Sequence, residues 1–406
     1  MRRPPARPSD RRGARAQPSA RAQPSARERE REPRRSPKGD VDVVVCAPAT
    51  EDLCREELAR AGARKPVALT EGVLVVPHGT ETAGLAFSRQ VLPRARFVQA
   101  ESASALADAV ARALDDDDER DWLSGALVVD VSLPDVLKTR ARSAGGLALP
   151  ASHPLEEGVA HIRDVLALKR AGRARKKDVA PAAAGAAARR VELLVTDAWS
   201  GALSSSHARD DDALSAWPVA FPAGRAPVDD DPNAPSTAHR KLDEALLWLG
   251  VAPREGEVVL DLGAAPGGWT HVALRHGARV VAVDRGFLDA RVLASGRVTH
   301  VRRDAFAVAV AGDIEGDVEA RGLVDDADWL VCDIIVEPER TLALLARALA
   351  SPRLRAFVVT LKLRRPVDFT VVERARELLA SDARFRARAV CLASNKVEIT
   401  LLGRAR

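Results

Sequence analysis

The sequence predicts an α/β protein whose C-terminal part forms an open, mostly parallel, doubly wound sheet, preceded by a smaller α+β region. Three observations support this fold class. Strand and helix patterns alternate regularly after residue 236, and the first strand of that series ends in a glycine-rich loop, LDLGAAPGGWT at 260–270. Shorter strands and helices alternate before residue 206. These patterns place the candidate binding site in the C-terminal part.

Length and composition narrow the class of protein. The chain has 406 residues, of which 46% are hydrophobic, enough for two or three domains with proper cores. No apolar run approaches the roughly 18 residues of a membrane span, and no secretory signal pattern is present. Cys46, Cys54, Cys332 and Cys391 lack CxxC spacing, and the histidines lack HExxH pairing. We therefore expect a reduced, cytoplasmic protein without a metal ion or a membrane partner.

The positive charge of the chain is concentrated in its first 40 residues. Residues 1–40 hold 13 Arg/Lys against 5 Asp/Glu, include a repeat of RAQPSA and show no apolar periodicity, so we expect disorder. The remaining residues hold 49 Arg/Lys against 52 Asp/Glu, so the net charge of +5 comes from the tail. The tail is either an arm that attracts RNA or an extension without a role.

Short strands and helices alternate in the region before residue 206, which is typical of small α+β modules. Residues 50–62, with Thr50 as the cap, form an expected amphipathic helix. The other expected elements are strands at 41–47, 72–79 and 126–133, helices at 82–92 and 102–115, and a strand-like segment at 191–206. LKRAGRARKK at 168–177 has six Lys/Arg among ten residues and is followed by a linker at 181–190. This basic run is either a solvated helix face or a surface that contacts phosphates.

The C-terminal part has a regular succession of strands and helices. A helix at 240–250, ended by Gly250, comes first. Strands are expected at 258–263, 278–284, 298–305, 329–334, 356–363, 387–393 and 397–403, with helices from about 267, at 338–350 and at 371–380. The last two strands are adjacent in the sequence, so we expect them to pair as an antiparallel hairpin at the edge of the sheet.

The glycine-rich loop predicts close approach of the backbone to a ligand. Gly263, Gly267 and Gly268 permit that approach and aim helix N–H groups outward. The loop reads G-A-A-P-G-G rather than GxGxxG, and Pro266 removes an N–H that a pyrophosphate would use. The loop therefore favours a ligand without phosphates, such as S-adenosylmethionine, over a dinucleotide.

Four acids are expected at the carboxyl ends of neighbouring strands. Asp261 is placed to attract an ammonium group, Asp284 to accept from ribose hydroxyls, and Asp304 to contact an adenine edge, while Asp333 ends the fourth strand. Any one of them alone could be a helix cap or a turn residue. Four acids at the carboxyl ends of neighbouring strands together favour a ligand site at this edge of the sheet.

The chain from about 235 to 406 resembles the FtsJ-like class of RNA ribose 2′-O-methyltransferases, and within it the RlmM family, which acts on a cytidine of 23S rRNA. The resemblance is carried by STAHRKLDEA at 236–245, LDLGAAPGGWT, WLVCDIIVEP at 329–338, TLKL at 360–363 and KVEITLLG at 396–403. It implies a methyltransferase domain over 236–406 with S-adenosylmethionine as cofactor.

The resemblance also implies the residues of the site. The Lys-Asp-Lys-Glu tetrad of the class falls on Lys241, Asp333, Lys362 and Glu398. Cofactor-binding residues would be Ser236, Asp261, Gly263, Ala265, Pro266, Gly267, Gly268, Trp269, Asp284, Asp304 and Asp333.

The same resemblance divides the rest of the chain. It implies an N-terminal α+β domain over 41–100, a THUMP-like RNA-binding domain with its basic linker over 101–206, and a loop over 207–235. The substrate would be 23S rRNA before the large subunit assembles.

Lys362 would act as the base that deprotonates a ribose hydroxyl, and a base must be neutral. Burial and the neighbouring Lys241 would lower its pKa, whereas Asp333 and Glu398 would raise it, so the sequence leaves the sign of the shift open.

Two alternative functions also stay open: the same chemistry on another rRNA site or on tRNA, and a non-catalytic RNA-binding or assembly protein. An NAD-dependent dehydrogenase is disfavoured by Pro266 and by the missing GxGxxG.

Overall fold

The computed structural model describes residues 40–47, 49–116, 127–132, 189–197, 199–207, 221–306 and 323–406, and residues 38–406 form one compact unit. The predictions for the tail before residue 40, for the basic run at 168–177 and for most of the linker at 181–190 lie outside the described residues. None of the helices within the described ranges is long and apolar enough to cross a bilayer.

The largest element is a seven-stranded sheet, here called the large sheet, with the order β11-β10-β9-β12-β13-β15-β14. Its neighbouring strands are parallel from β11 to β13, and β15 is antiparallel to both β13 and β14. The strands are β9 (Val258–Leu262), β10 (Arg279–Val283), β11 (Val298–Val301), β12 (Trp329–Cys332), β13 (Ala356–Lys362), β14 (Phe385–Val390) and β15 (Glu398–Ala405). The predicted doubly wound sheet with an antiparallel C-terminal pair is therefore confirmed.

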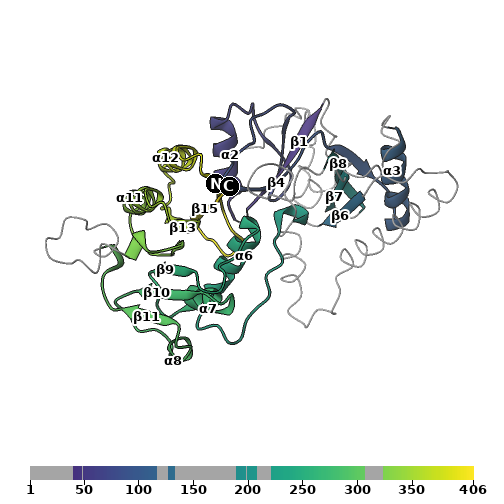
Figure 1. The fold of residues 1–406 in the computed structure, drawn as a ribbon. Coiled ribbons are helices and arrows are strands. Elements are labelled where there is room, and N and C mark those ends of the chain that lie inside the picture. The colour runs from purple at the N-terminus through teal and green to yellow at the C-terminus, as the bar shows by residue number, and fades with distance from the viewer. Residues whose placement is uncertain are drawn as a thin grey trace, which may run out of the picture. The chain divides into compact units, whose positions relative to one another are not determined.

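Helices cover both faces of the large sheet (Figure 1). Successive residues of a strand point to opposite faces, so β13 sends Phe357 and Val359 to one face and Val358 to the other. The first face packs against α11 (Pro338–Leu349) and α12 (Phe369–Ala380), and the second against α6 (His239–Leu249) and α7 (Gly268–Arg275). The short helix α8 (Ala290–Leu293) follows β10.

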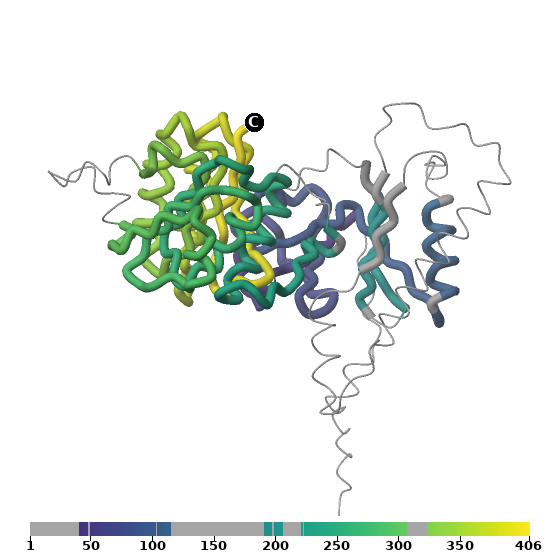
Figure 2. Tube along the Cα trace, turned by 60° about the horizontal axis from the view of Figure 1, so that its bottom comes forward, coloured from purple at the N-terminus to yellow at the C-terminus, as the bar shows by residue number. Residues whose placement is uncertain are grey.

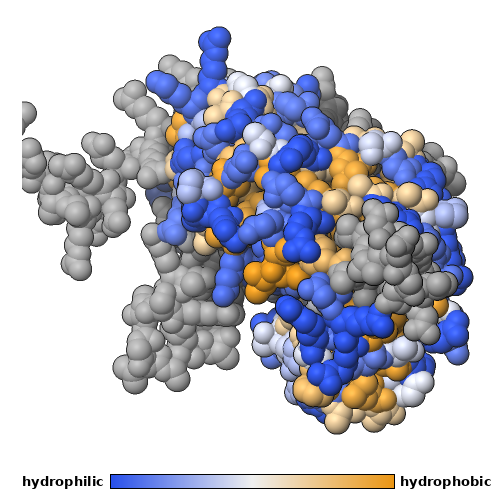
Figure 3. Space-filling view, turned by 90° about the vertical axis from the view of Figure 1, so that its left-hand side faces the viewer, coloured by the Kyte–Doolittle hydropathy of each residue, from blue (hydrophilic) through white to orange (hydrophobic). Residues whose placement is uncertain are grey.

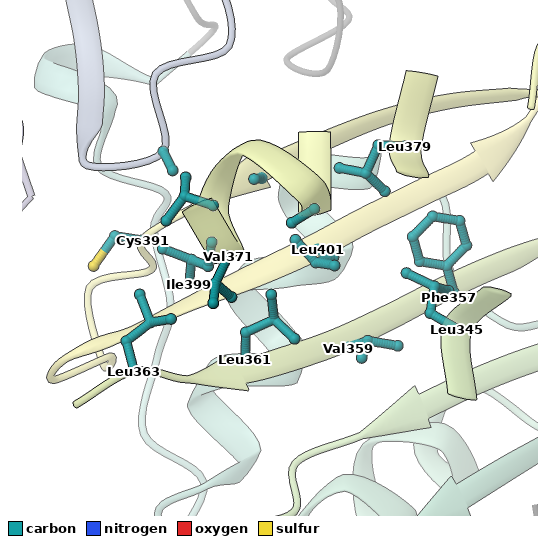
Figure 4. Packing of buried hydrophobic residues seen from close by; sticks show 14 of the residues in the cluster. Leu345, Phe357, Val359, Leu361, Leu363, Val371, Leu379, Cys391, Ile399 and Leu401 are labelled. Carbon is teal, nitrogen blue, oxygen red and sulfur yellow. The ribbon is translucent and has the colours of Figure 1, made fainter. Parts of the chain in front are cut away.

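The packing between β13, β15 and α12 is shown in Figure 4. Leu361 from β13 and Ile399 and Leu401 from β15 lie near Val371 of α12, and all four side chains are less than a tenth exposed. Burying each such side chain contributes roughly 1.5–3 kcal/mol. This contact fixes the register of the two strands whose ends carry Lys362 and Glu398.

A second sheet, the N-terminal sheet, is fully antiparallel with the order β2-β3-β1-β4. It consists of β1 (Val41–Cys46), β2 (Val67–Thr70), β3 (Val73–Pro77) and β4 (Ser88–Leu92), with helix α2 (Glu51–Arg60) after β1. Thr50 occupies the N-cap position of α2 as predicted, but its hydroxyl donates to the Ala47 carbonyl and makes no bond to a helix N–H.

The prediction of a helix at 82–92 is wrong. A turn with Gly84 at φ +73° comes first, and residues 88–92 then form strand β4 beside β1. The apolar spacing of this segment suggested a helix, but its polar residues are buried as well: Arg89 pairs with Glu244, and Gln90 donates to Glu192. Tertiary partners therefore override the local pattern.

A third sheet, the middle sheet, has the order β5-β8-β7-β6. It contains β5 (Arg96–Gln99), β6 (Leu127–Ser132), β7 (Arg189–Asp197) and β8 (Ser200–His207). The strand-like segment at 191–206 is thus two strands, β7 and β8, which pair antiparallel. Helix α3 (Ala103–Asp116) lies beside this sheet (Figures 1 and 2). It contacts β5.

Candidate active site

Three predicted catalytic residues point to the same face of the large sheet because of strand periodicity. Lys362 follows Val358 and Thr360 at intervals of two along β13, and Val358 belongs to the core that packs against α6 and α7. Glu398 has the same relationship to Leu402 in β15, and Asp333 to Val331 in β12. Helix α6 carries Lys241 over this face.

The four side chains form a closed ring of alternating charge. Lys241 Nζ lies 2.5 Å from Glu398 Oε1 and 3.2 Å from Asp333 Oδ2. Lys362 Nζ lies 2.5 Å from Glu398 Oε2 and also contacts Asp333 Oδ1. The four side chains are 9% to 18% exposed. The structure therefore brings together all four members of the predicted tetrad, with an opening to solvent.

The ring sets the protonation of Lys362. Burial alone would lower the pKa of Lys362, but the attraction and hydrogen bonds of Asp333 and Glu398 outweigh it and raise the pKa above its ordinary value. For Asp333, burial alone would raise the pKa, but Lys362 and Lys241 outweigh it and lower the pKa. The sequence left open whether the pKa of Lys362 is raised or lowered, and the structure shows that it is raised. Lys362 is therefore protonated in the ligand-free protein.

Two residues that support the ring were missed by sequence reasoning. Asn395 is buried, and its amide nitrogen, in the orientation that satisfies both amide atoms, lies 3.2 Å from Glu398 Oε1. Glu244, one helical turn after Lys241, accepts from the Ala393 amide at 2.8 Å. Asn395 directly precedes the motif at 396–403, and Glu244 lies within the motif at 236–245, but neither motif indicates that these side chains support the ring.

The glycine-rich loop is closely packed at each of its glycines. Gly263 and Gly267 have φ of +81° and +116°, which side chains rarely adopt. A Cβ at Gly263 would lie 2.5 Å from Ile334 Cγ1, and a Cβ at Gly268 would lie 2.4 Å from Ser236 Oγ. Ala265 and Pro266 form the tip of the loop, where Pro266 is exposed. The loop thus accepts only glycine at these points.

Ser236 is placed beside this loop with an unsatisfied group. Its hydroxyl is buried and has no hydrogen-bond partner among the described residues. Trp269, by contrast, is 4% exposed, packs in the core with α6, and donates its indole N–H to the Ala238 carbonyl at 2.9 Å. The Trp269 side chain therefore holds the loop against the start of α6, and its expected role in cofactor binding stays a prediction.

Asp261 is the last residue but one of its strand and is turned inward. It lies within β9, is 1% exposed, and accepts from Thr270 Oγ1 at 2.6 Å. Burial, together with the negative charges of Asp333 and Asp284, raises its pKa to about 7 despite the Thr270 bond. The expected attraction of an ammonium group by an open carboxylate at this position is therefore not supported by the geometry.

Asp284 and Asp304 follow β10 and β11 as expected, but both also organise the backbone. Asp284 accepts from the amides of Ala265 at 3.1 Å and Gly286 at 2.7 Å, so it ties the glycine-rich loop to the next strand end. Strand β11 ends at Val301, three residues before Asp304, and Asp304 caps the next turn by accepting from the Phe306 amide at 2.9 Å. Asp304 is exposed.

Two large apolar side chains are unusually exposed at this edge of the large sheet. Ile335, two residues after Asp333, is 89% exposed, and Phe287, three residues after Asp284, is 73% exposed. Arg302 lies over the Phe287 ring at 4.1 Å from its centroid. The exposed cations Arg285, Arg364 and Lys396 follow or precede the strand ends of the same edge. The face of the molecule drawn in Figure 3 shows hydrophobic side chains in patches among hydrophilic ones.

The similarity of this sequence to known proteins agrees with the geometry of the site. Residues 235–377 match the family of FtsJ-like methyltransferases. The resemblance expected from the sequence is therefore confirmed for this part of the chain, and so is the methyltransferase fold.

Particular relatives are curated proteins named "Ribosomal RNA large subunit methyltransferase M". The one from Thauera aminoaromatica is 35% identical over 171 residues, 41% of this chain and 42% of that protein. The one from Methylococcus capsulatus is 37% identical over 172 residues, 41% of this chain and 44% of that protein. The one from Azoarcus sp. BH72 is 34% identical over 199 residues, 47% of this chain and 50% of that protein. The matches thus span about half the length of these relatives.

Proposed function

We propose that this protein transfers a methyl group from S-adenosylmethionine to a ribose 2′-hydroxyl of RNA, with 23S rRNA as the substrate. The observation that carries the proposal is the ring of Lys241, Asp333, Lys362 and Glu398, with Lys362 Nζ at 2.5 Å from Glu398 Oε2 at the open edge of a methyltransferase fold. The names of the relatives favour ribosomal RNA of the large subunit.

The cofactor would lie between the glycine-rich loop and the ends of β10 and β12. Gly263, Gly267 and Gly268 leave no room for side chains of their own, and the buried Ser236 hydroxyl lacks a partner that a polar ligand would supply. Asp284 has free lone pairs for ribose hydroxyls, and Asp304 is accessible for the base. S-adenosylmethionine, when bound, supplies an electrophilic methyl group.

Lys362 would accept the proton of the hydroxyl. S-adenosylmethionine would supply the methyl group that the hydroxyl oxygen takes, with S-adenosylhomocysteine as the leaving group, and the hydroxyl proton would pass to Lys362 Nζ. Because the ring raises the pKa of Lys362, this lysine must first release its own proton to solvent. Lys241 and Glu398 orient Lys362, and Asp333 joins the two lysines. Holding the reacting groups in line supplies much of the acceleration.

The rim of the site supports an RNA substrate. Ile335, at 89% exposed, offers an apolar surface to an unpaired base next to the tetrad, and Arg285, Arg364 and Lys396 offer charge to phosphates. The expected THUMP-like domain over 101–206, which includes most of the middle sheet, would add further RNA contacts. An unpaired ribose is easier to reach in free rRNA than in a finished subunit, so the substrate would be rRNA before assembly.

Transfer of labelled methyl from S-adenosylmethionine to three substrates tests the proposal: protein-free 23S rRNA, assembled large subunits, and tRNA. We expect label in the free rRNA and little in the other two. Label only in tRNA would overturn the substrate and keep the chemistry. Cofactor binding without transfer to any RNA would favour a non-catalytic assembly protein.

A further inference from the structure

The N-terminal sheet is joined to the large sheet by a buried ion pair next to the tetrad. Arg89 of β4 donates from Nη2 to Glu244 Oε1 of α6 at 2.7 Å, and the two side chains are 1% and 2% exposed. Residues 155 positions apart thus meet in the interior. A buried pair of opposite charges holds its partners in one geometry, since either charge alone would be left without compensation.

Glu244 links three elements through its two carboxylate oxygens. Oε1 accepts from Arg89, while Oε2 accepts from the amide of Ala393 at 2.8 Å. Ala393 lies in the connection from β14 to β15, five residues before Glu398. Glu244 itself stands three residues after Lys241, almost one helical turn along the same helix. The carboxylate therefore lies between the backbone segments that carry two members of the ring.

A further bond anchors the same connection to the N-terminal segment. The amide of Cys391 donates to the carbonyl of Ala86 at 2.7 Å, and Ala86 precedes β4 by two residues. The segment 391–393 is thus held by residue 86 on one side and by Glu244 on the other. Asn395, which lies beside Glu398, follows this segment closely.

From these contacts we infer that Arg89 and Glu244 are positioning residues for the tetrad. The N-terminal sheet, through Arg89, fixes Glu244, and Glu244 fixes the distance between Lys241 and Glu398. Lys241 Nζ and Glu398 Oε1 are 2.5 Å apart, so a shift of α6 against the 391–398 segment by about an ångström would open the ring. The N-terminal sheet is then part of the catalytic unit as well as of any RNA-binding surface. The kinetic test of this inference rests on the proposed function, whereas hydrogen exchange does not.

Substitutions of the full chain can separate positioning from stability. Glu244→Gln keeps an acceptor for the Ala393 amide but turns a donor towards Arg89, and Arg89→Met removes the cation that donates to Glu244 Oε1. The double variant removes both charges of the pair together, so it should recover part of the loss of either single variant. Leu58→Ala, in the fully buried face of α2, is a stability control that leaves the pair intact. Glu373→Gln removes the half-exposed Arg60–Glu373 contact of 3.4 Å, which joins α2 to α12 away from the ring.

The first measurement is hydrogen exchange by mass spectrometry at a temperature where all variants are folded. We expect faster exchange in 239–249 and 391–398 for both single pair variants, with unchanged exchange in 258–275. Neither control should show this local pattern. Unchanged exchange in α6 and 391–398 for the pair variants would overturn the inference, whether or not the wild-type protein methylates RNA.

The second measurement is steady-state methyl transfer to protein-free 23S rRNA. We expect kcat to fall at least tenfold in each single variant, with the KM for RNA and the Kd for S-adenosylmethionine within about threefold of wild type. The double variant should regain part of kcat. An equal fall of kcat in Leu58→Ala would contradict positioning, because the effect would then follow stability alone. A wild-type protein without transfer would refute the proposed function, while the exchange pattern would still decide the inference.

Discussion

Lys362 and Glu398 lie directly opposite each other on the antiparallel strands β13 and β15, and their side chains meet at 2.5 Å. Directly paired residues on one face of an antiparallel pair have their side chains within reach of each other. The register is fixed by seven consecutive residue pairs from Ala356–Arg404 to Lys362–Glu398. The contact between the lysine and the glutamate is therefore built into the sheet and does not depend on a flexible loop.

Replacement of Lys362 should abolish turnover while sparing the cofactor site. We expect Lys362→Ala to lower kcat by about 10²–10⁴-fold, the usual contribution of a general base. Lys65→Ala, which removes an exposed lysine on the N-terminal part, is the matched control. Single-turnover methyl transfer and calorimetric binding of S-adenosylhomocysteine check both effects. Equal rates for Lys362→Ala and wild type would refute the assignment of the base.

The raised pKa of Lys362 predicts a rate that increases with pH. Asp333 and Glu398 outweigh burial and hold the proton on Lys362, so only a small fraction of the free protein has the neutral amine near pH 7. We expect log kcat/KM to rise by about one per pH unit from pH 7 to above pH 9, since an unperturbed lysine has a pKa of about 10.4.

The single-turnover rate of methyl transfer, measured at several pH values at which the RNA stays intact, checks this slope. A plateau below pH 8 would mean that Lys362 loses its proton more readily than the ring allows. Lys362→Arg, which stays protonated throughout this range, should show no rising limb.

Ser236→Ala should weaken cofactor binding without destabilising the protein. The hydroxyl of Ser236 is buried without a partner among the described residues, so its removal should leave the free energy of unfolding unchanged or raise it slightly. Loss of one hydrogen bond to the cofactor would raise the Kd by about five- to tenfold. Thermal unfolding with and without S-adenosylhomocysteine measures both quantities. A lower stability of the ligand-free variant with unchanged Kd would show that the hydroxyl serves the fold instead.

Asp261 should make the stability of the protein depend on pH. Its pKa in the folded protein is about 7, whereas an unfolded aspartate has a pKa of about 3.9. Between these values the folded state binds the proton and the unfolded state does not, so the free energy of unfolding falls as pH rises from about 4 to about 7. The loss is at most about 4 kcal/mol, because each pH unit corresponds to about 1.4 kcal/mol.

Denaturant unfolding of wild type and Asp261→Asn at several pH values measures this effect. The substituted amide would keep an acceptor for the Thr270 hydroxyl and carries no charge, so we expect the variant to gain stability relative to wild type as pH rises. Parallel stability curves for the two proteins would contradict the raised pKa.

Ile335 should contribute to binding of RNA and leave the chemistry intact. Its side chain is 89% exposed two residues after Asp333, where an unpaired base would contact it. We expect Ile335→Ala to raise the KM for RNA about fivefold, which corresponds to loss of roughly 1 kcal/mol of apolar contact. Val67→Ala, at a residue 60% exposed on β2, is the control. The same KM for both variants would remove Ile335 from the substrate surface.

The sequence predicted the order of the C-terminal strands and helices because each element has its own apolar period and its own end signal. The four tetrad residues followed from the resemblance, through short motifs at strand ends and at the start of α6, and the structure brings their side chains together. Their catalytic roles stay predictions.

The features that the sequence did not predict depend on contacts between distant segments. Residues 82–92 looked helical, but Arg89 and Gln90 are buried with partners more than 100 residues away. Asp261 was expected to attract an ammonium group, but its carboxylate is buried and accepts from Thr270 of α7. The pKa of Lys362 required the distances to Asp333 and Glu398, because burial and the two carboxylates shift it in opposite directions.

The role of the Lys362–Glu398 pair is tested most directly by nucleoside analysis of protein-free 23S rRNA after incubation with the protein and labelled S-adenosylmethionine. We predict that the label is in 2′-O-methylcytidine at a single position, where the RNA resists cleavage by alkali, and that Lys362→Ala produces no label. Label on a base, or equal ribose label with Lys362→Ala, would contradict the proposed role of the Lys362–Glu398 pair.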